Sequence, residues 1–264
     1  MPRKPTLSPT RLTLFLACPV KYRWTYLDPR GRPYLRSKSY YSFGSSLHKV
    51  LERFHDADDA GVTTAGEAVE ALGESWIDAG YRSQEEMEQA QDAGREILSR
   101  YVADRLERAP DAKVLAVERR FRYDMGDFVL LGIVDRIDRY PDGRIDVVDY
   151  KSGRSEVAPG EVKTDLAMGV YALLVSKVYP ESRITMTIYA LRTGASATAE
   201  LSPEEMREFE FDLRELGRQI LSTEFEELIP VPKPLCARCD FLPLCRRYPE
   251  YDERLIGLPL ETPA

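Results

Sequence analysis

The four cysteines of this 264-residue chain lie at its two ends. Cys18 stands near the start, while Cys236, Cys239 and Cys245 stand near the finish, and no cysteine falls between the two groups. One thiol plus three makes a complete four-ligand set for a metal ion or an iron–sulfur cluster. If the four share one site, that site joins the two ends of the chain and holds everything between them in a closed loop.

The composition predicts a globular protein with a sizeable core. The chain is 43% hydrophobic and 31% charged, and its length is sufficient for one large domain or two small ones. No apolar run approaches twenty residues, so no membrane-spanning helix and no membrane partner are expected. The first five residues, Met-Pro-Arg-Lys-Pro, lack a secretory hydrophobic stretch. We therefore expect a cytoplasmic location, in which the thiols stay reduced.

Charge is distributed unevenly along the chain. Residues 1–49 hold ten Lys or Arg and one acidic residue, a net charge of +9, so the remainder of this −7 chain carries −16. The basic stretch is also rich in aromatic rings: Tyr22, Trp24, Tyr26, Tyr34, Tyr40, Tyr41 and Phe43. Cations and rings together are typical of single-stranded nucleic-acid binding, but a solvated surface beside a packed aromatic cluster fits the composition equally well.

Apolar periodicity and turn residues divide the chain into helices and strands. Residues 27–42 look irregular. Helices are expected from Ser8 to Cys18, from about Gly44, and near 64–79, 84–108, 163–179 and 203–224. Strands are expected near 114–123, 128–138, 144–149, 183–192 and 196–201. One mixed α/β domain with helical flanks accounts for this order.

An acidic hairpin carries the strongest chemical signal. A three-residue loop at 141–143 would pair Tyr140 with Arg144, set Asp135 directly across from Asp149, and put Lys151 on the same face as Asp149. Two carboxylates facing each other among apolar residues need a cation between them, and oxygen ligands suit Mg²⁺ or Mn²⁺. A two-residue loop would break this pairing, and an ordinary surface hairpin is the alternative.

Such a site is suited to phosphodiester hydrolysis. A metal ion held by two carboxylates polarises a phosphoryl oxygen and lowers the pKa of a bound water, while Lys151 can orient or deprotonate that water. His48 lies on the amphipathic helix expected from Gly44, with Glu52 one turn later on the same side. On its own, His48 fits a packed core residue better than a metal ligand. His55 looks exposed, and no role is assigned to it.

These segments together resemble the RecB-like branch of the PD-(D/E)XK nucleases. The resemblance rests on Gly-Ser-Ser-Leu-His48, Gly-Ile-Val-Asp135-Arg-Ile-Asp and Val-Asp149-Tyr-Lys151-Ser-Gly. It extends from Cys18 to Cys245, because the one-plus-three cysteine pattern is similar to that of the iron–sulfur members, which include the AddB nuclease domain and the CRISPR adaptation nucleases. It implies a restriction-endonuclease-like core with a central mixed sheet flanked by helices.

The resemblance also implies an organisation and a set of site residues. We expect a single nuclease domain over 1–264, with a basic aromatic arm (1–43), a helical region (44–110), a nuclease core (111–225) and a three-cysteine arm (226–264). Metal ligands would be His48, Asp135, Asp149 and the Tyr150 carbonyl, and the catalytic residues would be Asp135, Asp149 and Lys151. Supporting or DNA-binding roles are expected for Glu52, Glu118, Arg136, Tyr171, Lys21, Arg23 and Trp24. The sequence departs from the family pattern at Ala167, where a glutamine usually precedes Tyr171 by four residues.

Three interpretations of the cysteines remain open from their spacing. A zinc ion commonly takes two close pairs, whereas C-x₂-C-x₅-C plus one remote cysteine is not two pairs. An iron–sulfur cluster accepts more varied spacing. Unligated buried cysteines are the third interpretation. The resemblance implies a [4Fe–4S] cluster held by Cys18, Cys236, Cys239 and Cys245, with a structural role.

We therefore expect a Mg²⁺- or Mn²⁺-dependent deoxyribonuclease, an exonuclease acting on single-stranded DNA or DNA ends in repair or recombination. A helicase or another repair protein is the expected partner. The alternatives are a CRISPR adaptation nuclease that trims DNA before integration and a non-catalytic DNA-binding scaffold of the same fold. The long helical stretch at about 60–110 favours the repair nuclease over the CRISPR nuclease.

Overall fold

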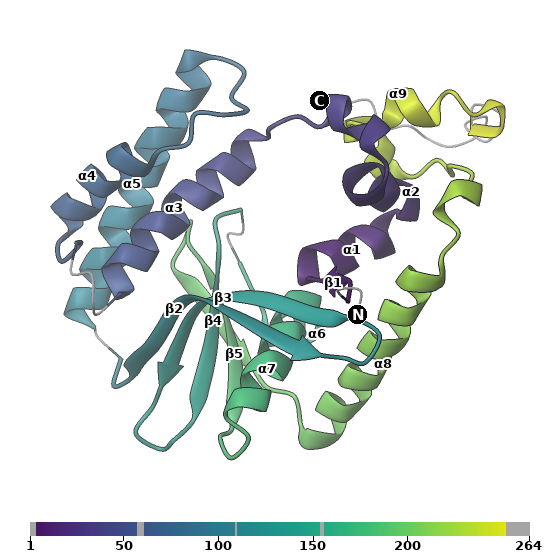
Figure 1. Ribbon diagram of the computed structural model, residues 1–264. Coiled ribbons are helices and arrows are strands. Elements are labelled where there is room, and N and C mark those ends of the chain that lie inside the picture. The colour runs from purple at the N-terminus through teal and green to yellow at the C-terminus, as the bar shows by residue number, and fades with distance from the viewer. Residues whose placement is uncertain (1–3, 57–60, 109, 154–155, 252–264) are drawn as a thin grey trace. The chain divides into compact units, whose positions relative to one another are not determined.

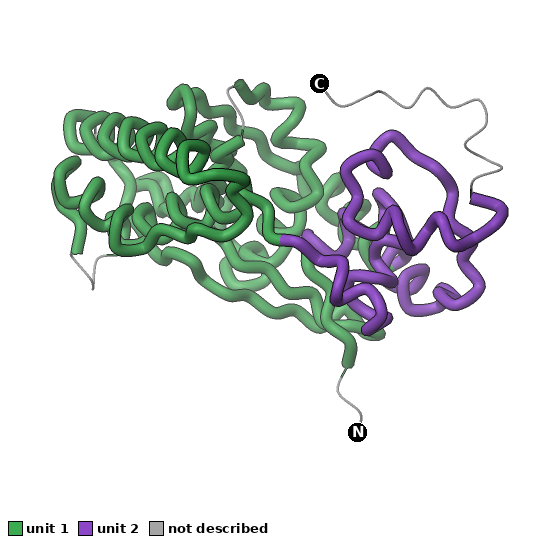
Figure 2. The backbone as a smooth tube through the Cα atoms, turned by 90° about the horizontal axis from the view of Figure 1, so that it is seen from above, with its two compact units in different colours: residues 1–9, 37–214 green, residues 10–36, 215–264 purple. Residues whose placement is uncertain are grey.

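The computed structural model describes residues 4–56, 61–108, 110–153 and 156–251. The backbone divides into two compact units, which Figure 2 shows in separate colours. The first unit contains residues 1–9 and 37–214, and the second contains residues 10–36 and 215–264. The second unit is thus assembled from both ends of the chain. Whether 1–264 acts as a single domain stays a prediction.

The first unit is built on a six-stranded mixed sheet (Figure 1). Its strands run in the order β1-β3-β4-β5-β6, and β2 pairs with β3. The pairs β1–β3 and β4–β5 are parallel, and the other pairs are antiparallel. The strands are β1 (Thr6–Leu7), β2 (Lys113–Asp124), β3 (Val129–Arg139), β4 (Ile145–Lys151), β5 (Ile184–Ala190) and β6 (Ala195–Ala199). The expected mixed sheet is confirmed, while β1 was not predicted because two residues give no periodic signal.

Helices pack against this sheet and bury its central strand. Ile145–Tyr150 of β4 is buried throughout, as expected for a strand covered on both faces. One core cluster joins Val148 and Tyr150 to apolar residues of α3 (Ser39–His55), α4 (Ala65–Ser75) and α5 (Gln84–Glu107). The remaining helices of this unit are α6 (Pro159–Thr164), α7 (Leu166–Val178) and most of α8 (Pro203–Ser222). Among the described residues, no helix is both long and apolar enough to cross a membrane.

Helix α3 begins at Ser39, five residues before the start that the sequence predicted. Lys38 precedes it in an extended conformation, and Ser42 and Phe43 are already buried. Phe43 precedes Leu47 by four residues, so it extends the apolar stripe of the helix by one turn. The prediction was wrong because prolines and glycine in the preceding stretch masked this turn. Those residues form a 3₁₀ helix over Pro29–Tyr34.

The β3–β4 hairpin has the predicted register. Arg136 pairs with Val148 and Arg139 with Ile145, and the Tyr140 N–H donates to the Arg144 carbonyl at 2.9 Å. The ladder ends at the Arg136–Val148 pair. Beyond that pair, the Tyr150 N–H donates to the Asp135 carboxylate at 2.8 Å. From this point a hydrogen bond from the β4 backbone to the Asp135 side chain therefore replaces the backbone–backbone pairing of β3 with β4.

Short helices from the two chain ends form the second unit. They are α1 (Pro9–Ala17), α2 (Pro19–Tyr22), a π-helix (Arg23–Leu27), 3₁₀ helices at Pro29–Tyr34, Phe225–Glu227 and Pro234–Arg238, the end of α8, and α9 (Leu242–Cys245). The Tyr22 ring stacks on Phe225 with centroids 5.4 Å apart. The buried Arg23 guanidinium donates to the Phe225 carbonyl and to the Glu226 carboxylate at 2.9 and 2.6 Å. Direct contacts therefore join the two ends of the chain.

Candidate active site

Glu118 and Asp135 face each other across the β2–β3 pair. Val117 pairs with Arg136 and Arg119 with Val134, so the register places Glu118 opposite Asp135. Glu118 has a backbone φ of 43°, and it is the one described residue other than glycine with a positive φ. A side chain in this region costs on the order of 1–3 kcal/mol, and such strain concentrates at functional sites. The sequence suggested Glu118 as acidic support but gave no sign of this conformation.

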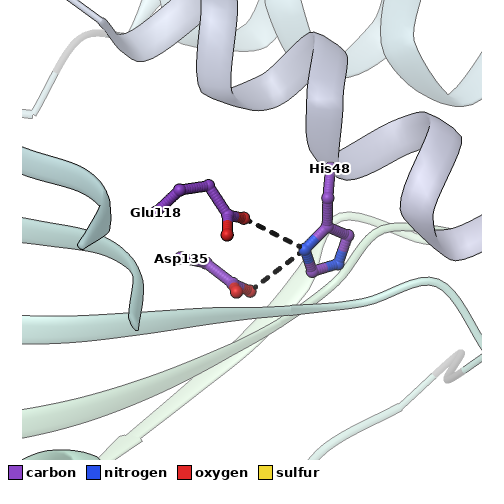
Figure 3. A group of neighbouring side chains, drawn as sticks. All are labelled: His48, Glu118 and Asp135. Carbon is purple, nitrogen blue, oxygen red and sulfur yellow. Dashed lines mark ion pairs between the residues drawn. The ribbon is translucent and has the colours of Figure 1, made fainter. Parts of the chain in front are cut away.

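His48 reaches these two carboxylates from α3, as Figure 3 shows. Its Nδ1 lies 3.5 Å from Asp135 Oδ2 and 3.7 Å from Glu118 Oε1. On the other side of the ring, Nε2 lies 3.0 Å from the Tyr150 carbonyl oxygen. A carbonyl only accepts, so Nε2 carries a hydrogen and Nδ1 faces the acids. Metal-binding histidines commonly show this arrangement, with one ring nitrogen donating to a carbonyl.

The acids change the charge of the His48 ring. Burial lowers the pKa of His48, but Asp135 and Glu118 more than offset burial and raise it to about 10. At neutral pH the imidazolium is therefore the cation that balances the two carboxylates. The ligand atoms of His48, Glu118 and Asp135 all lie within 4.8 Å of one another. One divalent ion could take the place of the proton, because imidazole and carboxylate are suitable ligands for Mn²⁺ and Mg²⁺.

Asp149 and Lys151 form an ion pair at the end of β4. Lys151 Nζ lies 2.7 Å from Asp149 Oδ2. Burial raises the pKa of Asp149 to about 6, Asp135 adds to the increase, and Lys151 opposes it. Asp149 is not in the tight group formed by His48, Glu118 and Asp135. The structure thus brings the predicted residues His48, Asp135 and Asp149 into one region, with Glu118 beside His48 and Asp149 paired to the lysine.

Two further predicted residues border the site. Burial and the charges of Asp149 and Asp135 raise the pKa of Tyr171, so its hydroxyl lies in the field of the acidic residues. Burial and the nearby Glu118 raise the pKa of Glu52. Ala167, at the usual glutamine position, has no side chain that could reach the site, and its N–H caps α7 by donating to Asp165 at 2.9 Å.

The buried Arg136 guanidinium holds the Tyr150 side chain in place. The Arg136 guanidinium, 4% exposed, donates to the hydroxyls of Tyr101 and Tyr150 and to His55 Nε2, and it also pairs with Asp138. His55 is therefore partly buried and bound, so the expectation that it is exposed was wrong. Burial and Arg136 lower the pKa of His55 to about 2. Arg136 is too buried to contact DNA directly, which favours a supporting role.

The four cysteines line one pocket in the second unit. Backbone N–H groups donate to two of the sulfurs, from Lys21 to Cys18 at 3.4 Å and from Lys233 to Cys236 at 3.3 Å. Burial and the neighbouring thiols raise the pKa of Cys245 to about 12. Four thiols that line one pocket, two of them buried and two with a peptide donor aimed at the sulfur, suit a cationic metal centre that would hold them as thiolates.

The spacing of the four sulfurs can be compared with the spacing that two kinds of metal centre require. Four sulfurs bound to one zinc ion at about 2.3 Å would lie about 3.8 Å apart. Among the described residues, the one group of three or more ligand atoms within 4.8 Å of one another is that of His48, Glu118 and Asp135, so no three cysteine sulfurs are that close. A four-iron cluster spreads its sulfurs more widely because each binds a different iron.

The other predicted residues of the basic arm lie in the second unit. Lys21 lines the cysteine pocket. Arg23 and Trp24 are 2% and 4% exposed. The Arg23 and Arg30 guanidinium groups lie 4.8 and 5.4 Å from the Trp24 ring centre. Burial favours a supporting role for Arg23 and Trp24 over a contact with DNA.

Comparison with known families agrees with this geometry. The family model for the PD-(D/E)XK nuclease superfamily matches residues 6–246. The chain therefore belongs to the PD-(D/E)XK nuclease superfamily, whose members use divalent metal ions.

Curated relatives are similar over part of the chain. One ATP-dependent helicase/deoxyribonuclease subunit, from Streptococcus pyogenes serotype M6, is 30% identical over 154 residues, which cover 57% of this chain and 14% of the relative. The serotype M18 protein gives the same values, and the serotype M49 protein is 29% identical. The chain thus corresponds to a small part of these relatives. The solved structure of SSO0001 aligns with a TM-score of 0.41 and 15% identity, covering 94% of this chain and 89% of that one.

Proposed function

We propose that this chain is a Mg²⁺- or Mn²⁺-dependent deoxyribonuclease, an exonuclease acting on single-stranded DNA or DNA ends during repair or recombination. The observation that carries the proposal is the meeting of His48, Glu118 and Asp135 beside the Asp149–Lys151 pair. The name of the Streptococcus relatives, which describes a helicase and deoxyribonuclease, supports DNA as the substrate.

The residues present fit a divalent ion. His48 Nδ1 and the carboxylates of Asp135 and Glu118 converge. Asp149 completes the proposed set, while the Tyr150 carbonyl accepts from His48 Nε2 on the other side of the ring and so orients the ring rather than binding the ion. When bound, the ion would polarise a phosphoryl oxygen and lower the pKa of a coordinated water. The protein holds the ligands in place beforehand, because the Tyr150 N–H binds Asp135 and the Tyr150 carbonyl binds His48.

Lys151 is the proposed catalytic lysine. Its ammonium lies against Asp149 and remains charged, since Asp149 raises the pKa of Lys151 against the effect of burial. A charged ammonium offsets negative charge that develops on the phosphate and orients the attacking water. Asp149 in turn holds the ammonium at the end of β4. Tyr171 and Glu52 border the site as supporting residues.

The proposal extends to partners and to the second unit. A helicase partner is proposed from the name of the relatives, and the cytoplasmic location expected from the sequence stays a prediction. We propose a [4Fe–4S] cluster at the four cysteines, supported by their shared pocket and by the finding that, among the described residues, no three cysteine sulfurs lie within 4.8 Å of one another. The intact Asp135, Asp149 and Lys151 oppose the non-catalytic alternative.

A degradation assay tests the nuclease proposal. End-labelled single-stranded and duplex DNA would be incubated with Mg²⁺, Mn²⁺ or chelator. We expect metal-dependent loss of label, and a decrease in rate of about 10²–10³-fold for Lys151→Ala and for Asp149→Asn. Asp142→Asn, an exposed acid in the turn of the same hairpin, is the matched control and should retain full activity. An Asp149→Asn protein that degrades DNA at the wild-type rate would overturn the mechanism.

A further inference from the structure

Two adjacent tyrosines are exposed on the first turn of α3. Tyr40 and Tyr41 are 61% and 66% exposed, and their rings lie 4.4 Å apart at an angle of 48°. Tyr22, Trp24 and Phe43, other rings of the basic N-terminal stretch, are buried. Within residues 1–49, Tyr40 and Tyr41 therefore carry the aromatic surface that is exposed on the first unit. Grouped apolar surface of this kind marks interaction sites more often than scattered residues do.

The turn that carries these rings is held in place. Ser42 Oγ donates to the Ala79 carbonyl at 2.7 Å, and Ser39 Oγ donates to the Glu86 carboxylate at 3.3 Å. The Phe43 ring packs edge-on against Trp76, with centroids 6.3 Å apart. The backbone beneath Tyr40 and Tyr41 is thus anchored on both sides. A partner that bound these rings would not have to order the helix first, which reduces the entropic cost of binding.

The same helix leads from the rings directly to the metal ligands. Tyr41 precedes His48 by seven residues, which is two helical turns, so the two lie on one face about 10 Å apart. Gly44 lies between them and contacts the segment after the catalytic lysine, because a Cβ built on it would lie 3.0 Å from Ser152 Oγ. The rings and His48 therefore lie two turns apart on one helix, with the segment after Lys151 packed against the turn between them.

An exposed cation lies beside this surface. The Leu191 N–H donates to the Lys151 carbonyl at 3.1 Å, so Arg192 leaves the sheet next to the catalytic lysine. The Arg192 guanidinium lies 5.4 Å from the centre of the Phe43 ring. Phe43 follows Tyr40 by three residues, which makes the two neighbours on the helix. Two exposed rings thus lie on the helix that carries His48, and one exposed cation follows the strand that pairs with the strand of Lys151.

We propose that Tyr40 and Tyr41 stack against unpaired bases of the DNA strand whose phosphodiester bond is cleaved, and that Arg192 contacts its backbone phosphate. This proposal rests on the proposed nuclease function and states how the nuclease would select its substrate. Every base has a π face that an aromatic ring can stack on, but in a duplex neighbouring bases cover that face. The surface therefore favours single strands and frayed ends. Because the rings lie on the helix that carries His48, the stacked bases should lie within a few nucleotides of the cleaved bond.

The test uses the full chain and an oligonucleotide series. The variant Tyr40→Leu/Tyr41→Leu removes the rings, Tyr40→Phe/Tyr41→Phe keeps them, and Phe211→Leu removes a ring that is 62% exposed elsewhere on the first unit. Single-stranded substrates carry one abasic site, moved by one nucleotide at a time relative to the cleaved bond. Binding is measured separately, in chelator, by the fluorescence of 2-aminopurine at the same positions.

We expect the Leu pair to lose about tenfold or more in affinity for single strands, with the Phe pair and Phe211→Leu near wild type. For wild type, KM should rise when the abasic site lies within a few nucleotides of the cleaved bond, and the Leu pair should lose this position dependence. Arg192→Gln should lower the salt dependence of binding by about one phosphate contact.

Unchanged affinity and an unchanged abasic profile in the Leu pair would overturn the proposal. If wild type cleaves no DNA, the nuclease proposal fails, and the 2-aminopurine arm still decides whether the rings bind bases.

Discussion

Glu118 lies opposite Asp135 across the β2–β3 pair, and its backbone adopts a φ of 43° to do so. The strain is compatible with the fold because regular pairs on both sides, Val117 with Arg136 and Arg119 with Val134, fix the strand. Both carboxylates then face His48 Nδ1. The strand thus keeps a backbone conformation that favours glycine at the position where an acid completes the candidate metal site.

Glu118→Gly should separate stability from metal binding. Glycine adopts a positive φ without steric cost, so the free energy of unfolding in chelator should stay level or rise by up to about 1 kcal/mol. Affinity for Mn²⁺ should fall about tenfold, because one carboxylate ligand is lost. Chemical denaturation and calorimetric titration with Mn²⁺ measure the two effects.

Arg120→Gly is the matched control for this substitution. It places glycine at an exposed position of the same strand, where the backbone is regular, so it should lower stability by about 0.5–1 kcal/mol and leave Mn²⁺ affinity unchanged. If Glu118→Gly destabilised the protein as much as this control does, the strain at Glu118 would not be real.

Metal binding should release a proton from His48. With its pKa raised to about 10, the ring is charged at pH 7, and a metal ion can bind Nδ1 only after the proton leaves. Affinity for Mn²⁺ should therefore rise about tenfold per pH unit between pH 7 and 9. Titration calorimetry in buffers of different ionisation enthalpy should give about one proton released by wild type and none by His48→Asn. Equal proton release in both proteins would exclude His48 as the source.

The hairpin and its acids could be predicted from sequence because their signals are local. Turn residues at 140–143 define a three-residue loop, the loop length defines the register of β3 against β4, and the register alone puts Asp135 near Asp149. The Arg136 network could not be predicted in this way. His55 lies 81 residues from Arg136 and Tyr101 lies 35 residues from it, and no local pattern connects them. The backbone of Glu118 is likewise fixed by its partners rather than by its neighbours in sequence.

The same limit applies to the basic arm. Composition groups all residues of 1–49, whereas the structure assigns 10–36 to the second unit and the start of α3 to the first. Burial then separates rings that composition counts alike, since Trp24 is in a core and Tyr41 is exposed. Packing therefore decides which aromatic residues can meet a ligand.

Protein purified without oxygen should contain iron and absorb visible light. Cys18→Ala and Cys245→Ala should each lose the absorbance and the bound iron, because every sulfur of a four-ligand set is needed. Proteolysis should then reach the second unit, residues 10–36 and 215–251, before the first. Arg247→Gln removes another contact between the chain ends, to the Tyr34 hydroxyl, and should keep its iron. A colourless wild-type protein with stoichiometric zinc would contradict the cluster.

His55 should make the protein sensitive to acid. Burial and Arg136 lower the pKa of His55 to about 2 in the folded state, whereas in the unfolded chain it is about 6.5. Below pH 6.5 the unfolded chain binds a proton at His55 that the folded protein does not bind. The free energy of unfolding therefore falls as the pH falls, by up to about 1.4 kcal/mol per pH unit. Above pH 6.5 His55 contributes no pH dependence.

Urea unfolding of wild type and His55→Gln at pH 5, 6 and 7.5 measures the difference. Glutamine still offers an acceptor to Arg136 but does not titrate, so its stability should fall less steeply between pH 6 and 5. Parallel curves for the two proteins would show that His55 is protonated as readily in the folded state as in the unfolded chain, and would contradict its buried, neutral form beside Arg136.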